Sequence, residues 1–118
     1  MALISATVSG TVLLSEAAPE APGAVARIFV EEVSRADAAA TIVARLEIPG
    51  AVLRAAGGTL PFSLAVERID PAKRYAVRIH IDANGDGRIG AGDHVSTESY
   101  PVITQGADTH VEVRVGRI

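Results

Sequence analysis

Residues 75–82 read Tyr-Ala-Val-Arg-Ile-His-Ile-Asp, and this stretch decides the fold class. Large apolar side chains occupy every second position, which is the period of a β-strand that buries one of its faces. The same alternation returns in residues 62–66 and in residues 111–115. Four further segments also qualify as strands: residues 4–14, 25–33, 41–48 and 95–103. The sequence therefore predicts seven strands.

The composition agrees with this prediction. Valine and isoleucine number 24 (14 and 10), against 8 for leucine and methionine (7 and 1). Branching at Cβ favours strands because such side chains pack well on a pleated surface and lose rotamer freedom in helices. Turn signals separate the strands: residues 15–23, Pro49-Gly50, Gly57-Gly58, Asp70-Pro71 and residues 106–108. We expect an all-β, seven-strand antiparallel β-sandwich with Greek-key connections, formed by residues 1–118 as a single domain.

Charge and cysteine content exclude several kinds of function. The net charge is −3, so no excess of positive charge is available for binding nucleic acid. The absence of cysteine excludes a disulfide, a catalytic thiolate and a lipid-modified cysteine within the chain as written. No apolar stretch reaches the roughly 18 residues of a transmembrane helix. Residues 1–10 lack a basic region and a sustained apolar core, so they do not form a signal peptide. We expect a cytoplasmic protein if the chain is complete, and a periplasmic or outer-membrane-associated protein if a leader has been removed.

One acidic segment points to metal chemistry. Residues 82–93 read Asp-Ala-Asn-Gly-Asp-Gly-Arg-Ile-Gly-Ala-Gly-Asp, with oxygen-bearing side chains at positions 1, 3, 5 and 12 and glycine at position 6. This is the spacing of a twelve-residue calcium loop, in which the chain wraps around a cation that needs six to eight oxygens. The predicted ligands are the side chains of Asp82, Asn84, Asp86 and Asp93 and the carbonyl of Arg88. Gly87 is expected to turn the chain with a positive φ, and Ile89 to anchor the loop to the core.

A metal-free turn is the alternative for this segment. Asn84-Gly85 and Asp86-Gly87 are both hairpin turn signals. A turn alone, however, gives no reason for Asp82 and Asp93 to stand in register with them. The flanking residues have the period of strands, so we predict an EF-hand-like loop between two strands. Aspartate at position 12 is a shorter ligand than glutamate, and the predicted affinity for Ca²⁺ is weak, about 10⁻⁵ to 10⁻³ M. The ion would stabilise the hairpin by binding the folded state.

Other catalytic or metal-binding arrangements receive little support. The three histidines, His80, His94 and His110, stand on separate predicted strands and could form a zinc site only if the fold brings them together. Exposed strand histidines are the simpler interpretation. Neither Ser96 nor Ser99 lies in a nucleophile-elbow pattern. We therefore do not expect an enzyme.

Several short motifs together resemble one family. They are Pro22-Gly23-Ala24, Val33-Ser34-Arg35-Ala36-Asp37, Leu60-Pro61-Phe62, residues 70–75 and residues 100–104. In this order and spacing the chain resembles, over about residues 7–115, the YbaY-like lipoproteins and the YscW-type pilotins, which are lipoprotein chaperones of type III secretion. The resemblance implies a prealbumin- or transthyretin-like β-sandwich, a location at the outer membrane and a binding role. Pilotins bind the C-terminal segment of a secretin subunit.

We therefore expect a non-enzymatic, envelope-associated β-sandwich with one calcium-stiffened hairpin. Its expected partner is a secretin-like protein or another envelope protein. A transthyretin-like module that binds or hydrolyses a small ligand through His80, His94 or His110 is the alternative. A structural domain of a larger surface protein is a third possibility. The sequence does not predict the oligomeric state.

Overall fold

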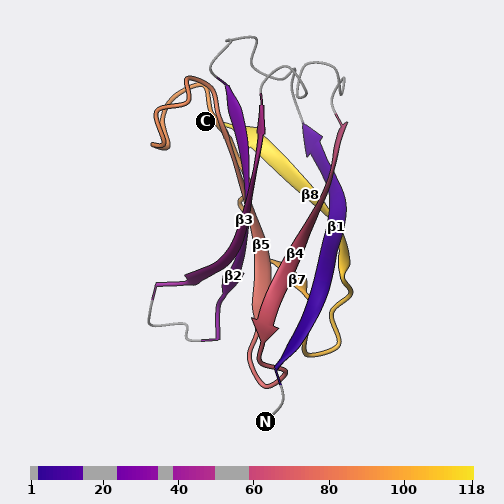
Figure 1. Cartoon of the computed structure of the whole chain (residues 1–118). Coiled ribbons are helices and arrows are strands. Elements are labelled where there is room, and N and C mark those ends of the chain that lie inside the picture. Colours follow the sequence, from indigo (N-terminus) through magenta and orange to yellow (C-terminus); the bar gives the residue numbers. More distant parts are fainter. Residues whose placement is uncertain (1–2, 15–23, 35–38, 50–58) are drawn as a thin grey trace.

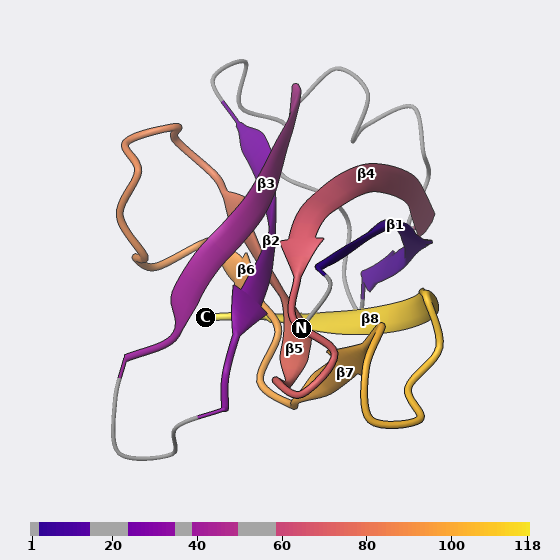
Figure 2. The same cartoon turned by 60° about the horizontal axis from the view of Figure 1, so that its bottom comes forward.

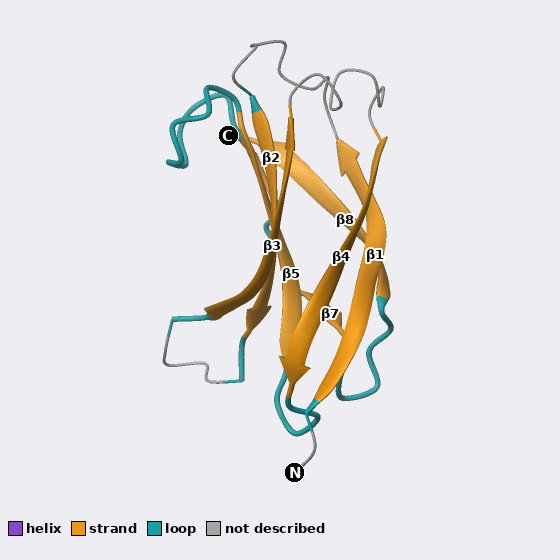
Figure 3. Cartoon of the chain, viewed as in Figure 1, coloured by secondary structure: helices purple, strands orange, loops and turns teal. Residues whose placement is uncertain are grey.

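The computed structural model describes residues 3–14, 24–34, 39–49 and 59–118 (Figure 1). These residues form strands and loops, and no helix occurs among them (Figure 3). The strands are β1 (Ile4–Leu14), β2 (Val25–Glu32), β3 (Thr41–Pro49), β4 (Thr59–Ile69), β5 (Tyr75–Asp82), β6 (His94–Val95), β7 (Tyr100–Val102) and β8 (His110–Arg117). The all-β prediction is confirmed. The turns predicted at residues 15–23, at Gly50 and at Gly57-Gly58 lie outside the described ranges.

The strands form one hydrogen-bonded path in the order β3-β2-β5-β6-β8-β1-β4, with β7 paired to β5 beside it. The two end strands of the path, β3 and β4, lie near each other, so the sheet curls into a nearly closed, barrel-like form (Figures 1 and 2). A sandwich of two separate sheets is not confirmed, because the path is continuous. The transthyretin-like subclass and the single-domain organisation stay predictions.

The antiparallel prediction is wrong at one pair of strands. β1 and β8 run parallel, with Cα partners from Ser9↔His110 to Leu14↔Val115, whereas the other pairs are antiparallel. Parallel neighbours require a long crossover connection. Here the crossover connection consists of the whole chain between β1 and β8. No local pattern in the sequence predicts such a pairing.

The predicted strand at residues 95–103 is two strands, so the described chain has eight strands and not seven. Between the pairs Val77↔Tyr100 and His80↔Val95, two residues of β5 face the four residues 96–99. The extra residues form a short irregular connection between β6 and β7, in which the Ser96 hydroxyl oxygen accepts the Ile79 N–H at 3.0 Å. A side-chain oxygen thus replaces the backbone acceptor that would have continued the ladder.

The core follows the predicted alternation. The large side chains of β5 at Tyr75, Val77, Ile79 and Ile81 are all buried, together with apolar side chains from β1, β2, β4 and β8. No helix able to cross a membrane occurs in the part of the chain that the structure describes. The opposite face of β5 is also covered at one end, where His80 and Asp82 are buried. This covered end leads into the acidic loop.

A candidate metal site in the acidic loop

The acidic loop connects two hydrogen-bonded neighbours. β5 ends at Asp82, and β6 begins immediately after Asp93. Because Ile81 is the Cα partner of His94, the two aspartates stand next to each other where the strands part. The end of the chain also holds the loop, since the Ile118 N–H donates to the Asp93 carbonyl at 2.8 Å. The loop projects from the sheet beside the C-terminus (Figures 1 and 3).

Asp82 is fully buried and accepts three hydrogen bonds. Its Oδ1 accepts the Gly85 N–H at 3.0 Å, and its Oδ2 accepts the Gly87 N–H at 2.7 Å. Oδ2 also lies 3.2 Å from Nη2 of Arg27, which reaches it from β2. Gly85 and Gly87 have φ of 71° and 79°, so the positive φ predicted at Gly87 is confirmed. The turn thus aims two amides at one carboxylate.

Asp93 has an equivalent set of partners on the other side of the loop. Its Oδ1 accepts the Ala83 N–H at 2.9 Å and its Oδ2 accepts the Gly90 N–H at 3.1 Å. Oδ2 also lies 2.7 Å from Nε2 of His80, and both residues of this pair are buried. Both ends of the calcium-like spacing are therefore held by the protein's own donors.

These donors keep the two carboxyl groups ionised. Burial by itself raises the pKa of each carboxyl group, because it removes the charged form from water. For Asp82, the bonds from the Gly87 amide and from Arg27 outweigh burial, and its pKa falls below the ordinary 3.8. For Asp93, the bonds from His80 and the Ala83 amide do the same, and its pKa is also lowered. Both side chains are carboxylates at neutral pH.

The remaining predicted ligands lie at the exposed tip of the loop. Asn84 Oδ1 accepts the Asp86 N–H at 3.3 Å, and Asp86 Oδ1 accepts the Arg88 N–H at 2.9 Å. Asn84, Asp86 and Arg88 are all exposed. Ile89 is 61% exposed, so the prediction that it anchors the loop to the core is wrong. The buried carboxylates of Asp82 and Asp93 hold the loop instead, because they bind its backbone amides directly.

The structure adds a residue that the loop spacing does not include. Ligand atoms of His80, Asp82 and Asp93 lie within 4.8 Å of one another, and all three residues are buried. His80 stands two positions before Asp82 on β5, so both point to the same face of the strand. Strand alternation could have predicted that proximity. Asp86 does not belong to this group, and calcium binding stays a prediction.

The other histidines do not join this group in the described chain. His94 is buried because β6 lies between β5 and β8, so the predicted exposure is wrong for His94 as well as for His80. His110 is exposed as predicted, with its Nδ1 3.2 Å from the Ser9 hydroxyl oxygen. No carboxylate of the described residues hydrogen-bonds to the His110 ring, so this pair lacks the third group of a catalytic triad.

With the fold and the loop described, comparison with known proteins identifies the class. Residues 4–115 match the model of a family described as type III secretion system lipoprotein chaperone (YscW). The chain belongs to this family, which confirms the resemblance found in the sequence. Its structure is similar to one described as an alternative pilotin from the type II secretion system of Vibrio cholerae, with 26% sequence identity, a TM-score of 0.79 and 98% of each chain covered. No curated protein sequence matches the chain.

Proposed function

We propose that the protein is a pilotin-like chaperone of the cell envelope, which binds a secretin-like protein of a secretion system and catalyses no reaction. The observation that carries this proposal is the family match over residues 4–115. The similarity to a pilotin over 98% of both chains supports it, because the likeness extends over the whole fold and not over one motif.

The edge of the sheet at β3, which lies near β4 but is not hydrogen-bonded to it among the described residues, offers a surface suited to such a partner. β3 ends the hydrogen-bonded path, and an open edge can add a strand from another chain. The register with β2 shifts between Val30 and Glu31, and Ile42 and Val43 of β3 are 47% and 38% exposed. Val43 and the half-exposed Leu3 also line a cavity of about 250 Å³, whose walls carry charged side chains as well, from Glu32, Arg68, Asp70 and Lys73. An extended apolar segment of a secretin would bury the apolar side chains.

Binding of a secretin peptide tests this proposal. We expect labelled peptides from secretin C-termini to bind the protein with a dissociation constant in the micromolar range, measured by fluorescence anisotropy. Val43→Asp should weaken binding at least tenfold, because it replaces an exposed apolar side chain of the edge strand by a charged one. Ile89→Asp is the matched control, since Ile89 is also exposed but lies on the acidic loop. Absence of binding at several hundred micromolar peptide would contradict the secretin version of the proposal.

We further propose that the acidic loop binds one calcium ion with low affinity. The spacing of its oxygen atoms and the approach of Asp82 to Asp93 support this proposal. An ion that uses these carboxylates competes with Arg27 and His80 for the same oxygen atoms. That competition is the physical reason to expect weak binding. The ion would stabilise the hairpin and would take no part in a reaction.

Calcium is therefore expected to raise the melting temperature. With a dissociation constant of about 1 mM, a concentration of about 10 mM adds about 1.4 kcal/mol to the free energy of unfolding. For a chain of this length that gain corresponds to roughly 5 °C.

Asp86→Ala should abolish the rise in melting temperature with little effect on the metal-free protein, because Asp86 is exposed. Glu112→Ala, an exposed acid on β8, should leave the rise unchanged. An unchanged melting temperature of the wild type in calcium would remove the metal site.

A further inference from the structure

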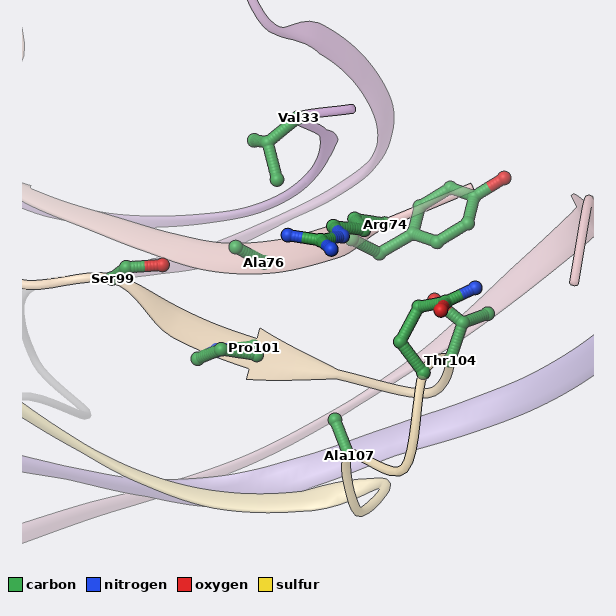
Figure 4. A pocket seen from close by; sticks show the side chains of 9 residues that line it. Val33, Arg74, Ala76, Ser99, Pro101, Thr104 and Ala107 are labelled. Atoms are coloured by element: carbon green, nitrogen blue, oxygen red, sulfur yellow. The ribbon is translucent and has the colours of Figure 1, made fainter. Parts of the chain in front are cut away.

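A second cavity lies at the other end of β5, where the strand begins, away from the acidic loop. It has a volume of about 600 Å³, within the usual range of ligand pockets. Ala76 of β5 and Pro101 of β7 line it, and the two are Cα partners in the sheet (Figure 4). Val33 and Ala107 contribute further apolar lining. Small side chains on neighbouring strands leave this part of the sheet hollow.

Arg74 is the one charged residue among the described residues that line this cavity. Its backbone is fixed on both sides, since its N–H donates to the Ser34 hydroxyl at 2.8 Å and its carbonyl accepts the Val33 N–H at 2.9 Å. In Figure 4 its guanidinium lies over the cavity near Ala76, and Ser99 lies at the edge of the same space. Among the described residues no carboxylate pairs with Arg74. A guanidinium in this position favours an anion, and its fork of N–H groups matches a carboxylate.

The wall opposite Arg74 is rigid. The Thr104 hydroxyl donates to the Lys73 carbonyl at 2.5 Å, and the Gln105 side-chain amide donates to the Pro71 carbonyl at 3.1 Å. Ile103 and Gln105 have φ of 76° and 58°, a conformation that a β-branched residue such as isoleucine rarely adopts. Strained backbone of this kind persists where surrounding contacts impose it, and it is frequent beside binding sites. A preformed wall reduces the entropy lost when a ligand binds.

We propose that this cavity binds a carboxylate carried on a short, branched apolar group. The carboxylate accepts hydrogen bonds from Arg74 and Ser99, and the apolar group packs on Ala76 and Pro101. Two sources have this chemistry, namely a small branched-chain carboxylic acid and the free carboxyl end of a polypeptide with an apolar last residue. The first source does not depend on the proposed function, whereas the second rests on it, because the C-terminal segment of a secretin also ends in a free carboxyl group.

Titration of the ¹⁵N-labelled protein tests the site. The probes are 4-methylpentanoate, its neutral amide, and acetyl-Gly-Leu-Leu with either a free or an amidated carboxyl end. We expect the two carboxylate probes to shift the backbone amide signals of Ala76, Ser99 and Ala107, and the two neutral probes to bind at least tenfold more weakly. Tighter binding of the free peptide than of the small acid assigns a polypeptide terminus as the source, and equal binding assigns the small acid.

Variants separate this site from general charge effects. Arg74→Gln should weaken carboxylate binding at least tenfold, and Ser99→Ala should weaken it by a smaller factor. Arg74 and Arg45 are both exposed, so Arg45→Gln removes the same charge from an equally accessible position on β3, away from the cavity, and should change nothing. Equal binding of the neutral probes, unchanged binding by folded Arg74→Gln, or shifts confined to other surfaces would overturn the proposal. None of the probes contains a secretin sequence, so such a failure would leave the proposed function standing.

Discussion

Alanine at position 10 is expected to lower the free energy of unfolding by at least about 4 kcal/mol, a large fraction of the roughly 5–15 kcal/mol of an ordinary domain. Gly10 lies in β1 between Phe62 of β4 and Val111 of β8, its Cα partners on the two sides. A Cβ at this position would stand 1.9 Å from the Val111 carbonyl oxygen and 2.8 Å from Cζ of Phe62. The carbonyl belongs to the backbone of a paired strand, so it cannot move away without breaking the β1–β8 ladder.

Urea unfolding of Gly10→Ala beside Gly116→Ala measures this effect. Gly116 also lies in a paired strand, β8, but apart from its own chain neighbours no heavy atom of the described residues stands within 4 Å of the Cβ that alanine would add. Its replacement should change the free energy of unfolding by no more than about 0.5 kcal/mol. Adding Phe62→Leu to Gly10→Ala relieves only the 2.8 Å contact, so the double variant should stay destabilised. Equal stability of the two alanine variants would contradict the packing described for β1.

The elements predicted well are those in which burial alone sets the pattern. β5 spans residues 75–82 as the alternation indicates, because a strand that buries one face must place apolar side chains at every second position. The break between β6 and β7 was not predictable in this way. It depends on the Ser96 hydroxyl accepting a backbone N–H of β5, and alternation carries no information about such a contact. The parallel pairing of β1 with β8 was hidden for a related reason, since the pattern gives a strand its faces but not its neighbours.

The residues of the candidate site also fall into those that the sequence could predict and those that it could not. The convergence of Asp82 and Asp93 follows from loop spacing, because both stand where β5 and β6 separate. Arg27 comes from β2, 55 residues away along the chain, and reaches Asp82 only because it is the Cα partner of His80. Sequence spacing within the loop cannot supply a neighbour that the sheet register brings in. The approach of the two carboxylates could therefore be predicted from the sequence, whereas the contact between Asp82 and Arg27 could be found only once the strand pairing was known.

Asp82→Ala is expected to lower the free energy of unfolding by about 3–5 kcal/mol, the range for removing one partner of a buried ion pair. The variant leaves the Gly85 and Gly87 amides without the acceptor that they have in the wild type. It also removes the buried partner of Arg27, which keeps the exposed Glu47 at 3.2 Å. Chemical unfolding at pH 7 measures the loss. Asp86→Ala, at the exposed tip of the same loop, should change the free energy of unfolding by no more than about 0.5 kcal/mol. Similar values for the two variants would show that the loop does not depend on the buried carboxylate.

The free energy of unfolding, measured as a function of pH in the acid range, separates the contribution of the charge of Asp82 from the contribution of its shape. The pKa of Asp82 is lowered in the folded protein, so the stability from its ionised form is present above the unfolded value of 3.8 and is lost as pH falls through the folded pKa. Asp82→Asn keeps the size of the side chain but cannot titrate. Its free energy of unfolding should therefore fall less steeply below about pH 4 than that of the wild type. Asp93 also has a lowered pKa, so some slope should remain. A variant with the full slope of the wild type would mean that the bonds from Gly87 and Arg27 do not favour the charged form.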